Sequence, residues 1–263
     1  MLSPIATFSP DMTSSELNVP LATIAVPSFN QGLFLDQALA SIFSQGVPVE
    51  VFVLDGGSTD QSLDVISRWK DHLAGYRSHR DEGQAAAINE GIRNGRAKYV
   101  CWLNSDDWFL PGALSRLVEM ADRSPQAPMV YGRCWNHIES KGTKKAVWVE
   151  PFSERRLAQR CIIAQPATLI RRTAWEEVGG VDPTLHMTMD YDLWWRLYKT
   201  GGAPHFVSDY VAVNRVHEGT KTRNNRRLHY KEAISLVRRH HGTVPLKWWL
   251  AQPYAVWLKS LFG

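Results

Sequence analysis

The sequence predicts an α/β fold in which a mostly parallel central sheet is flanked by helices. Short apolar runs alternate with segments of helical periodicity through the first half of the chain. The runs end at polar, turn-forming residues, and no internal repeat or low-complexity linker interrupts the 263 residues. Strands that alternate with helices in this way indicate βαβ units, which build parallel sheets. A hydrophobic content of 44% is enough for one large core.

The first half of the chain contains the clearest alternation. Apolar runs indicate buried strands, and apolar residues that recur at about 3.6 positions indicate helices. In order, we expect a strand at Leu21–Val26, a helix at 33–43, a strand at Val49–Leu54, a helix at 63–69, a helix at Gln84–Asn94, a strand at Tyr99–Leu103 and a helix from Pro111 to about Ala121. The unit of strand, loop and helix therefore repeats.

The second half has a different pattern, which we interpret as part of the same domain. It predicts strands at Met129–Cys134 and Ala146–Val149 around a polar hairpin or loop, helices at Ser153–Cys161, Arg171–Val178 and Asp190–Thr200, and a strand at Phe206–Val213. The expected organisation is a flexible leader at 1–20, one domain at 21–220 with halves at 21–122 and 123–220, and a basic, Trp-rich helical tail at 221–263.

Composition limits the class of protein. The first twenty residues contain neither a basic segment nor an apolar stretch, so we expect no secretory signal or membrane anchor there, and a cytoplasmic protein. The three cysteines are widely spaced and odd in number, which favours reduced thiols over disulfides or a zinc site. No recognised nucleic-acid-binding motif is present, and we predict no nucleic-acid partner.

The tail combines basic and aromatic residues. Seven Lys or Arg residues and a single Glu lie between Lys221 and His240, and Trp248, Trp249 and Trp257 follow. Aromatic residues beside a basic helix favour an interfacial segment on anionic lipid. Docking of the same helix on the protein's own core is the alternative.

Polar residues follow the predicted strands, where open α/β sheets place their ligands. Asp106 and Asp107 come just after one apolar run; they indicate a cation site or catalytic acid, or else a turn. Asp55 follows another run, where its carboxylate could accept a hydrogen bond from a uracil ring or a ribose. Asp60 is better explained as a helix cap. The segment Pro27, Ser28 and Phe29 could hold a base. Neither a dinucleotide-binding nor a P-loop glycine pattern occurs.

These residues belong to an ordered set of motifs that resembles the family-two inverting glycosyltransferases of GT-A fold. The motifs are Val26-Pro-Ser-Phe-Asn, Val53-Leu-Asp-Gly-Gly-Ser-Thr-Asp, Asp81-Glu-Gly-Gln with Ala87-Ile-Asn-Glu-Gly, Trp102-Leu-Asn-Ser-Asp-Asp and Met189-Asp-Tyr-Asp-Leu-Trp-Trp-Arg-Leu. The resemblance runs from about Leu21 to about Lys221. It implies a nucleotide-sugar donor across the sheet edge and a divalent cation, Mn²⁺ or Mg²⁺, that bridges the donor diphosphate to an Asp-x-Asp motif.

By this resemblance, the Asp-x-Asp motif corresponds to Asn104-Ser105-Asp106. Asn104 replaces the first carboxylate, so Asp106 is the expected metal ligand, with Asp107 as an alternative, and Asn104 and Ser105 contact the donor. His217 resembles a late histidine that completes the metal or diphosphate site.

The resemblance also assigns the remaining site residues. Asp190 matches the catalytic base, although Met189 stands where the family commonly has Glu. Asp81 matches a segment near the donor, and Lys221 and Arg223 neutralise the leaving diphosphate. Asp192 is interpreted as a helix N-terminal charge. Trp194 and Trp195 fit a core better than an acceptor stack.

The activity that this implies is an inverting, metal-dependent, hexosyltransferase-like reaction in surface polysaccharide synthesis. A sugar moves from a nucleoside-diphosphate donor, with UDP favoured, to a glycan or a polyprenyl-diphosphate-linked glycan. The resemblance and the tail together place the protein peripherally at the inner face of the cytoplasmic membrane. A nucleotidyltransferase remains an alternative, as does a catalytically silent nucleotide-sugar or membrane-associated binding module.

Overall fold

The computed structural model of the protein describes residues 19–221 and 225–253, with side chains as far as Leu250. Expectations that concern residues 1–18, Arg223 and residues 254–263, Trp257 included, lie outside these ranges.

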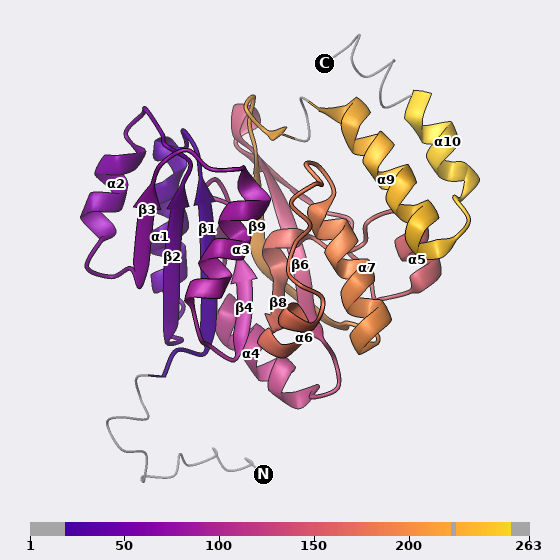
Figure 1. Cartoon of the computed structure of the whole chain (residues 1–263), viewed down its shortest axis with the longest axis horizontal. Coiled ribbons are helices and arrows are strands. Elements are labelled where there is room, and N and C mark those ends of the chain that lie inside the picture. The colour runs from indigo at the N-terminus through magenta and orange to yellow at the C-terminus, as the bar shows by residue number, and fades with distance from the viewer. Residues whose placement is uncertain (1–18, 222–224, 254–263) are drawn as a thin grey trace.

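A sheet of nine strands forms the centre of the molecule (Figure 1). The strands are β1 (Ala22–Ser28), β2 (Val49–Asp55), β3 (Gly75–Ser78), β4 (Tyr99–Trp102), β5 (Trp108–Phe109), β6 (Met129–Ile138), β7 (Thr143–Ala146), β8 (Thr168–Arg171) and β9 (His205–Val216). They lie in the order β3-β2-β1-β4-β8-β6-β9-β5, with β7 beside β6. Pairing directions show that β1, β2, β3, β4, β6 and β9, six of the nine, point the same way, which confirms a mostly parallel sheet.

Helices cover both faces of this sheet. One face packs on α1 (Gly32–Phe43), α2 (Ser62–Trp69) and α4 (Ala113–Arg123). The other packs on α3 (Gln84–Asn94), α6 (Arg172–Glu177), α7 (Met189–Gly201) and α9 (Arg226–His241). Successive strand residues point to opposite faces, so Ala25 of β1 belongs to one core while Ile24 and Val26 belong to the other. Three layers result, as the sequence predicts.

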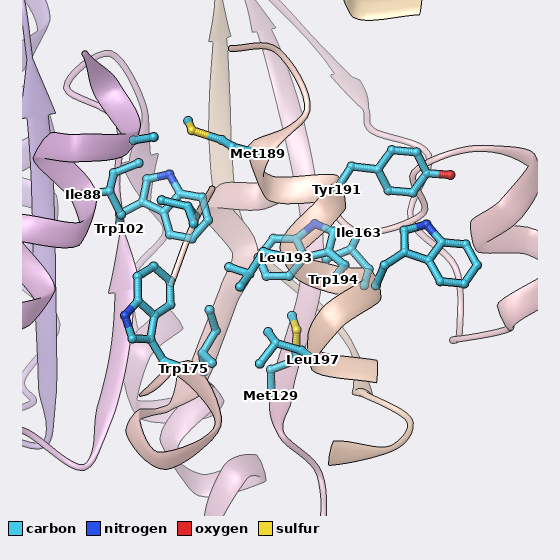
Figure 2. Packing of buried hydrophobic residues seen from close by; sticks show 14 of the residues in the cluster. Ile88, Trp102, Met129, Ile163, Trp175, Met189, Tyr191, Leu193, Trp194 and Leu197 are labelled. Carbon is cyan, nitrogen blue, oxygen red and sulfur yellow. The ribbon is translucent and has the colours of Figure 1, made fainter. Parts of the chain in front are cut away.

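Tryptophans dominate the core between the sheet and α7. Trp102 stacks on Trp194 with ring centroids 6.0 Å apart and meets Trp175 edge-on at 6.1 Å (Figure 2). Trp194 and Trp195 are fully buried. Both therefore act in packing, and neither presents a face to an acceptor sugar.

The observed elements differ from the predicted ones in short or polar strands. The helix at Gln84–Asn94 has the predicted bounds. The prediction of a strand at Ala146–Val149 was wrong, because the strand is Thr143–Ala146, whose exposed residues pair with β6 across the 3-10 turn η2 (Glu139–Lys141). Strands β3, β5 and β8 were not predicted, since runs of two to four residues show no periodicity.

The tail begins as part of the folded domain. Helix α9 lies beside α7, and α10 (Leu246–Pro253) packs against α9 (Figure 1). Trp248 of α10 is buried, and its indole N–H donates to the carbonyl of Ala158, 2.8 Å away, just inside α5 (Glu154–Gln159). This supports the docking alternative for α10, yet Leu246, Trp249 and Leu250 stay 76%, 45% and 77% exposed. In the described part of the chain, no helix has the length and apolarity needed to cross a bilayer.

Candidate active site

A cavity of about 1320 Å³ opens at the carboxyl ends of β1, β2, β4, β6 and β9. Nine of the predicted site residues line it, namely Pro27, Ser28, Phe29, Asp81, Asn104, Ser105, Asp106, Asp190 and Lys221. The other three predicted residues, Asp55, Asp107 and His217, lie outside its lining. The sheet edge thus collects residues that are up to 194 positions apart (Pro27 to Lys221).

Asp55 organises the loop after β2 rather than facing the cavity. It is fully buried. One carboxylate oxygen accepts from the Ser58 hydroxyl at 2.5 Å, and the other accepts from the Gly57 and Ser58 amides and from the Ser78 hydroxyl, at 2.6 to 3.1 Å. Gly57, with φ of +84°, completes the turn. In this arrangement Gly56 and Gly57 line the cavity, and Asp55 does not.

The loops after β1 and β2 are held together by direct hydrogen bonds. The Asn30 amide donates to the Ser58 hydroxyl at 2.7 Å, and the Thr59 amide donates to the Asn30 side chain at 2.9 Å. Asp60 accepts from the amides of Gly32 and Ser62, which confirms its structural role at the starts of α1 and α2. Phe29 remains 60% exposed at the mouth of the cavity, available to a planar ligand.

Asp81 lies on the same side of the cavity and is partly neutralised. Its carboxylate pairs with the Arg77 guanidinium at 2.9 Å and accepts from the Gly83 amide at 2.9 Å. Arg77 in turn donates to the carbonyl of Asp55 at 2.7 Å. Asp81 is therefore held by its own loop and strand β3.

A chain of amide side chains crosses the middle of the cavity. Gln84 donates to Asn104 at 2.8 Å, and Asn104 donates to Asp107 and to Gln165, both at 3.2 Å. The Lys221 ammonium donates to Gln84 at 3.3 Å. An aspartate at position 104 would have no N–H to give to Asp107. The local structure thus explains why asparagine fits at the position where this chain departs from the Asp-x-Asp pattern.

Asp107 is enclosed by protein. It is 2% exposed and accepts from the backbone amide of Arg215 at 2.9 Å. Burial, with the neighbouring Asp106 charge, raises its pKa well above the ordinary aspartate value. Arg215 lies between the rings of Phe34 and Trp108 and donates to the carbonyl of Asp106 at 3.0 Å. These contacts give Asp107 a structural role in holding the loop after β4 to β9.

Asp106 and His217 meet although they are 111 positions apart in the sequence. The Asp106 carboxylate lies 3.1 Å from His217 Nε2. An imidazole nitrogen and a carboxylate oxygen are suitable ligands for Mn²⁺, which takes further oxygens from phosphates and water. Within the residues described, no group of three or more His, Cys, Asp or Glu side chains converges on one point. The pair therefore fits a cation that is held jointly by the protein and a bound diphosphate.

Asp190 lies in the first turn of α7 and lines the same cavity as Asp106. It is half-buried, and its carboxylate accepts from the Tyr191 amide at 2.8 Å. Burial raises the pKa of this carboxyl group above the ordinary aspartate value, while the charges of His229 and Lys221 oppose the rise. A carboxylate with a raised pKa is a better proton acceptor near neutral pH.

Helix α9 supports the segment that leads to Asp190. The Glu232 carboxylate accepts from the backbone amides of residues His186, Met187 and Thr188 at 2.8 to 3.2 Å, and from the Thr188 hydroxyl at 3.1 Å. Near the other end of α9, the Nε2 of His240 lies 2.8 Å from the carboxylate of buried Asp192, within hydrogen-bonding distance. Asp192 therefore joins α7 to α9, beyond the helix-charge role expected for it.

Sequence reasoning missed several residues that the fold brings to the site. Gln165, Arg215, His229 and Glu232 lie on segments with no motif that the sequence analysis used. Arg160 lines the cavity from the end of α5 and was also missed. The position of Arg215 in β9, two residues before His217, was the available signal.

A family model decides the classification. The model described as Glycosyl transferase family 2 matches residues 23–178, more than half of the chain. The chain belongs to this glycosyltransferase family. The resemblance noted in its motifs is thereby confirmed.

Curated relatives agree with the family assignment. An uncharacterized glycosyltransferase of Rickettsia typhi, RT0329, is 24% identical over 77% of this chain and 66% of its own length. The chondroitin synthase of Escherichia coli is 24% identical over 78% of the chain, and the hyaluronan synthase of Pasteurella multocida is 27% identical over 78%. The chain spans only 30% and 21% of the length of these two synthases.

Solved structures confirm the GT-A-like fold. Staphylococcus aureus TarS 1–349 in complex with UDP-GlcNAc superposes with a TM-score of 0.69 at 16% identity, covering 89% of this chain and 73% of TarS 1–349. The mannosyltransferase PcManGT of Pyrobaculum calidifontis, in complex with GDP-Man and Mn²⁺, gives 0.67 at 20% identity, covering 90% of this chain and 72% of that one.

Proposed function

We propose that this glycosyltransferase is an inverting, metal-dependent enzyme that transfers a sugar from a nucleoside-diphosphate donor, with UDP favoured, to a glycan or a lipid-linked glycan in polysaccharide assembly. One observation carries the proposal. Asp106 and the desolvated carboxylate of Asp190 line one cavity, at the sheet edge that binds ligands in α/β folds, and His217 contacts Asp106 from just outside the lining.

The proposed donor end consists of the loops after β1 and β2. Pro27, Ser28 and Phe29 contact the base, and backbone groups of Gly56 and Gly57 contact the base or ribose, with Asp55 as the residue that positions them. Asp81 contributes from the adjoining loop. The known complexes of similar fold with UDP-GlcNAc and GDP-Man support a nucleotide-sugar ligand and leave the base a proposal.

The diphosphate is proposed to lie in the middle of the cavity. Asp106 and His217 would hold a Mn²⁺ or Mg²⁺ ion there, and the ion would supply positive charge to the departing diphosphate. Asn104, Ser105 and Lys221 also line the cavity and are proposed to contact the donor. Lys221 adds a cation whose pKa is lowered by burial, although Glu232 and Asp190 oppose that shift.

Asp190 is the proposed base. An inverting transfer requires a group that removes the proton from the acceptor hydroxyl as its oxygen attacks the anomeric carbon opposite the diphosphate. Because burial raises the pKa of Asp190, kcat should fall on the acid side at a pH above the range of an ordinary aspartate.

Product analysis tests the proposed reaction. Wild-type protein with UDP-sugars, Mn²⁺ and a glycan panel should release UDP, whereas a nucleotidyltransferase would release or consume pyrophosphate. Asp190→Asn should lower kcat about 10²- to 10⁴-fold while the Kd for UDP stays unchanged. Donor binding without turnover on any acceptor, or full activity of Asp190→Asn, would contradict the proposal and favour a silent binding module or another base.

Metal dependence is tested separately. Asp106→Ala should abolish the stimulation of UDP binding by Mn²⁺, measured by calorimetry with and without a chelator. Asp71→Ala is the matched control, because Asp71 is an exposed acidic residue just after α2 that does not line the cavity. Equal UDP affinity in chelator and in Mn²⁺ would refute the metal role.

We further propose that α10 rests on an anionic membrane surface, consistent with a peripheral position at the inner face of the cytoplasmic membrane. Its exposed Leu246, Trp249 and Leu250 are adjacent to α9, whose last turn carries Arg238 and Arg239. Such a surface suits anionic lipid.

Wild type should sediment with phosphatidylglycerol vesicles and less with phosphatidylcholine vesicles. Trp249→Ser with Leu250→Ser should remove this binding without loss of UDP affinity; unchanged sedimentation would refute it.

A further inference from the structure

Arg160 carries a positive charge at the cavity wall and forms no ion pair with the described residues, although its charge acts on Glu150 at longer range. It follows α5 and lines the cavity together with Asp190, His186 and Met187. Its Nε is buried without a hydrogen-bond partner, and among the described residues no carboxylate lies within 4.0 Å of its guanidinium. A buried donor without an acceptor is costly, and such groups are usually satisfied by water, an ion or a ligand.

The side chains that surround Arg160 do not neutralise it. Glu150, the nearest acidic side chain on the preceding segment, is already paired with Arg156 at 2.7 Å. Tyr230 of α9 has a pKa raised by burial, and the positive charge of Arg160 opposes that rise, so the two side chains lie close together. The N–H donors of the Arg160 guanidinium therefore remain available to a ligand in the cavity.

An exposed aromatic ring adjoins the guanidinium. Arg160 lies 4.8 Å from the ring centroid of Trp148, and Trp148 is 56% exposed. The guanidinium covers one face of this indole, and Trp148 is not among the residues that line the cavity. The exposed part of the ring therefore offers a stacking surface beside the cavity, while the cation offers two parallel donors. Together they match a sugar ring that carries an anionic group.

The arrangement adjoins the proposed base. Cys161, the residue after Arg160, also lines the cavity, and burial and then the charge of Asp190 raise the pKa of its thiol, so Asp190 lies close to it. His229 lines the same part of the cavity from α9, and its Nδ1 is likewise buried without a hydrogen-bond partner among the described residues. Two buried nitrogens without partners, Arg160 Nε and His229 Nδ1, therefore belong to residues that line the same cavity as the carboxylate that would receive the acceptor proton.

We propose that Arg160, with His229 and the Trp148 ring, forms an acceptor subsite for a saccharide that bears an anionic group, either a carboxylate or a phosphate. The anion binds the guanidinium, the sugar ring packs on Trp148, and a hydroxyl group of that sugar reaches Asp190. This inference rests on the proposed glycosyl transfer and specifies the class of acceptor.

Binding of matched probe pairs tests the subsite in the full-length chain, with saturating UDP so that the diphosphate position is filled. One pair is methyl β-glucuronide against methyl β-glucoside, and the other is glucose 1-phosphate against methyl α-glucoside. We expect the anionic member of at least one pair to bind about tenfold more tightly, since charge-assisted hydrogen bonds are the stronger ones. The pair that shows the difference identifies the source of the anion.

Variants assign any preference to Arg160. Arg160→Gln should abolish the anionic preference while UDP affinity and the unfolding midpoint remain at wild-type values. Arg160→Lys keeps the charge without the planar fork and should retain part of the preference. Arg155→Gln removes an equal charge from an exposed position of the same helix and should change nothing.

The outcomes separate this inference from the function on which it rests. Failure of the wild type to bind UDP would refute the proposed function. UDP binding with no preference for either anionic probe would refute the subsite alone. A preference that survives in Arg160→Gln, or that Arg155→Gln also removes, would likewise overturn the assignment to Arg160.

Discussion

The two ends of the cavity are built in opposite ways. At the donor end, most polar groups have partners: Asp55 accepts from Gly57, Ser58 and Ser78, and Asn30 joins the loops after β1 and β2, while the Ser28 hydroxyl is the buried group without a partner among the described residues there. At the acceptor end, Arg160 and His229 each have a buried nitrogen without a partner, and Asp190 is desolvated.

This difference indicates how each end contributes to function. Most polar groups at the donor end already have hydrogen-bond partners within the protein. This end is therefore formed before ligand arrives, and binding a nucleotide there requires little rearrangement. The acceptor end has buried nitrogens without partners and a desolvated carboxylate, and both cost free energy in the unliganded protein. A ligand that supplies hydrogen-bonding groups reduces this cost. Substitutions at the donor end should therefore reduce stability first, and those at the acceptor end should reduce turnover first.

The largest effect on stability is expected for Asp55→Ala. Removal of this buried carboxylate takes away the acceptor of four hydrogen bonds from Gly57, Ser58 and Ser78, of which Ser58 is itself buried, and the free energy of unfolding should fall by about 3 kcal/mol or more. Urea unfolding measures this loss, and the exposed Asp71→Ala variant should stay within about 0.5 kcal/mol of wild type. If Asp55→Ala is as stable as wild type, the hydrogen bonds of Asp55 do not stabilise the donor end, and the contrast between the two ends of the cavity fails.

Asn104→Asp should have the next largest effect, about 2 kcal/mol of lost stability with a chelator present. The new carboxylate would replace an N–H donor that lies 3.2 Å from the buried Asp107 carboxylate. Asn104→Ala, which removes the hydrogen bonds without adding charge, should lose less. If the two variants unfold at the same urea concentration, repulsion between carboxylates is not the reason for asparagine at this position.

Glu232→Gln tests whether the C-terminal helix α9 positions the proposed base. One oxygen of the carboxylate accepts from Met187, Thr188 N–H and the Thr188 hydroxyl, and an amide cannot supply both oxygens as acceptors. We expect kcat to fall about tenfold, or about 1.4 kcal/mol, because a displaced base reacts less often. The Kd for UDP and the KM for the donor should not change.

Glu177→Gln, on the exposed surface of α6, is the matched control for that variant. A rise in donor KM with normal kcat in Glu232→Gln would show that α9 supports the donor end instead, and the contrast between the two ends would be lost.

The smallest effect concerns the stability of Asp190→Asn. Because burial raises the folded-state pKa of Asp190, ionisation of this group opposes folding as pH rises through that value. The asparagine variant should therefore be more stable than wild type at pH 7, with the difference vanishing below the unfolded aspartate pKa of about 4. Chemical unfolding at several pH values measures it; a variant less stable than wild type at pH 7 would contradict the assigned desolvation.

The sequence predicted the donor end better than the acceptor end. Residues Pro27 to Phe29, Asp81, and Asn104 to Asp106 follow strands within contiguous motifs, so their positions at one sheet edge follow from strand order. Asp55 was expected to face the donor, and the fold turns its carboxylate inward, because the Gly57 turn brings two backbone amides toward it.

The sequence by itself determined the parallel sheet, the glycosyltransferase family resemblance and nine of the residues that line the cavity. Periodicity and strand-end motifs are local properties, and they survive in any fold that buries the same apolar runs. Only the tertiary structure decided the partners of those residues: His217 with Asp106, Glu232 with the segment before Asp190, and Arg160 with Trp148. Contacts between α9, α7 and the loops depend on how helices pack across the sheet, and no spacing along the chain encodes that.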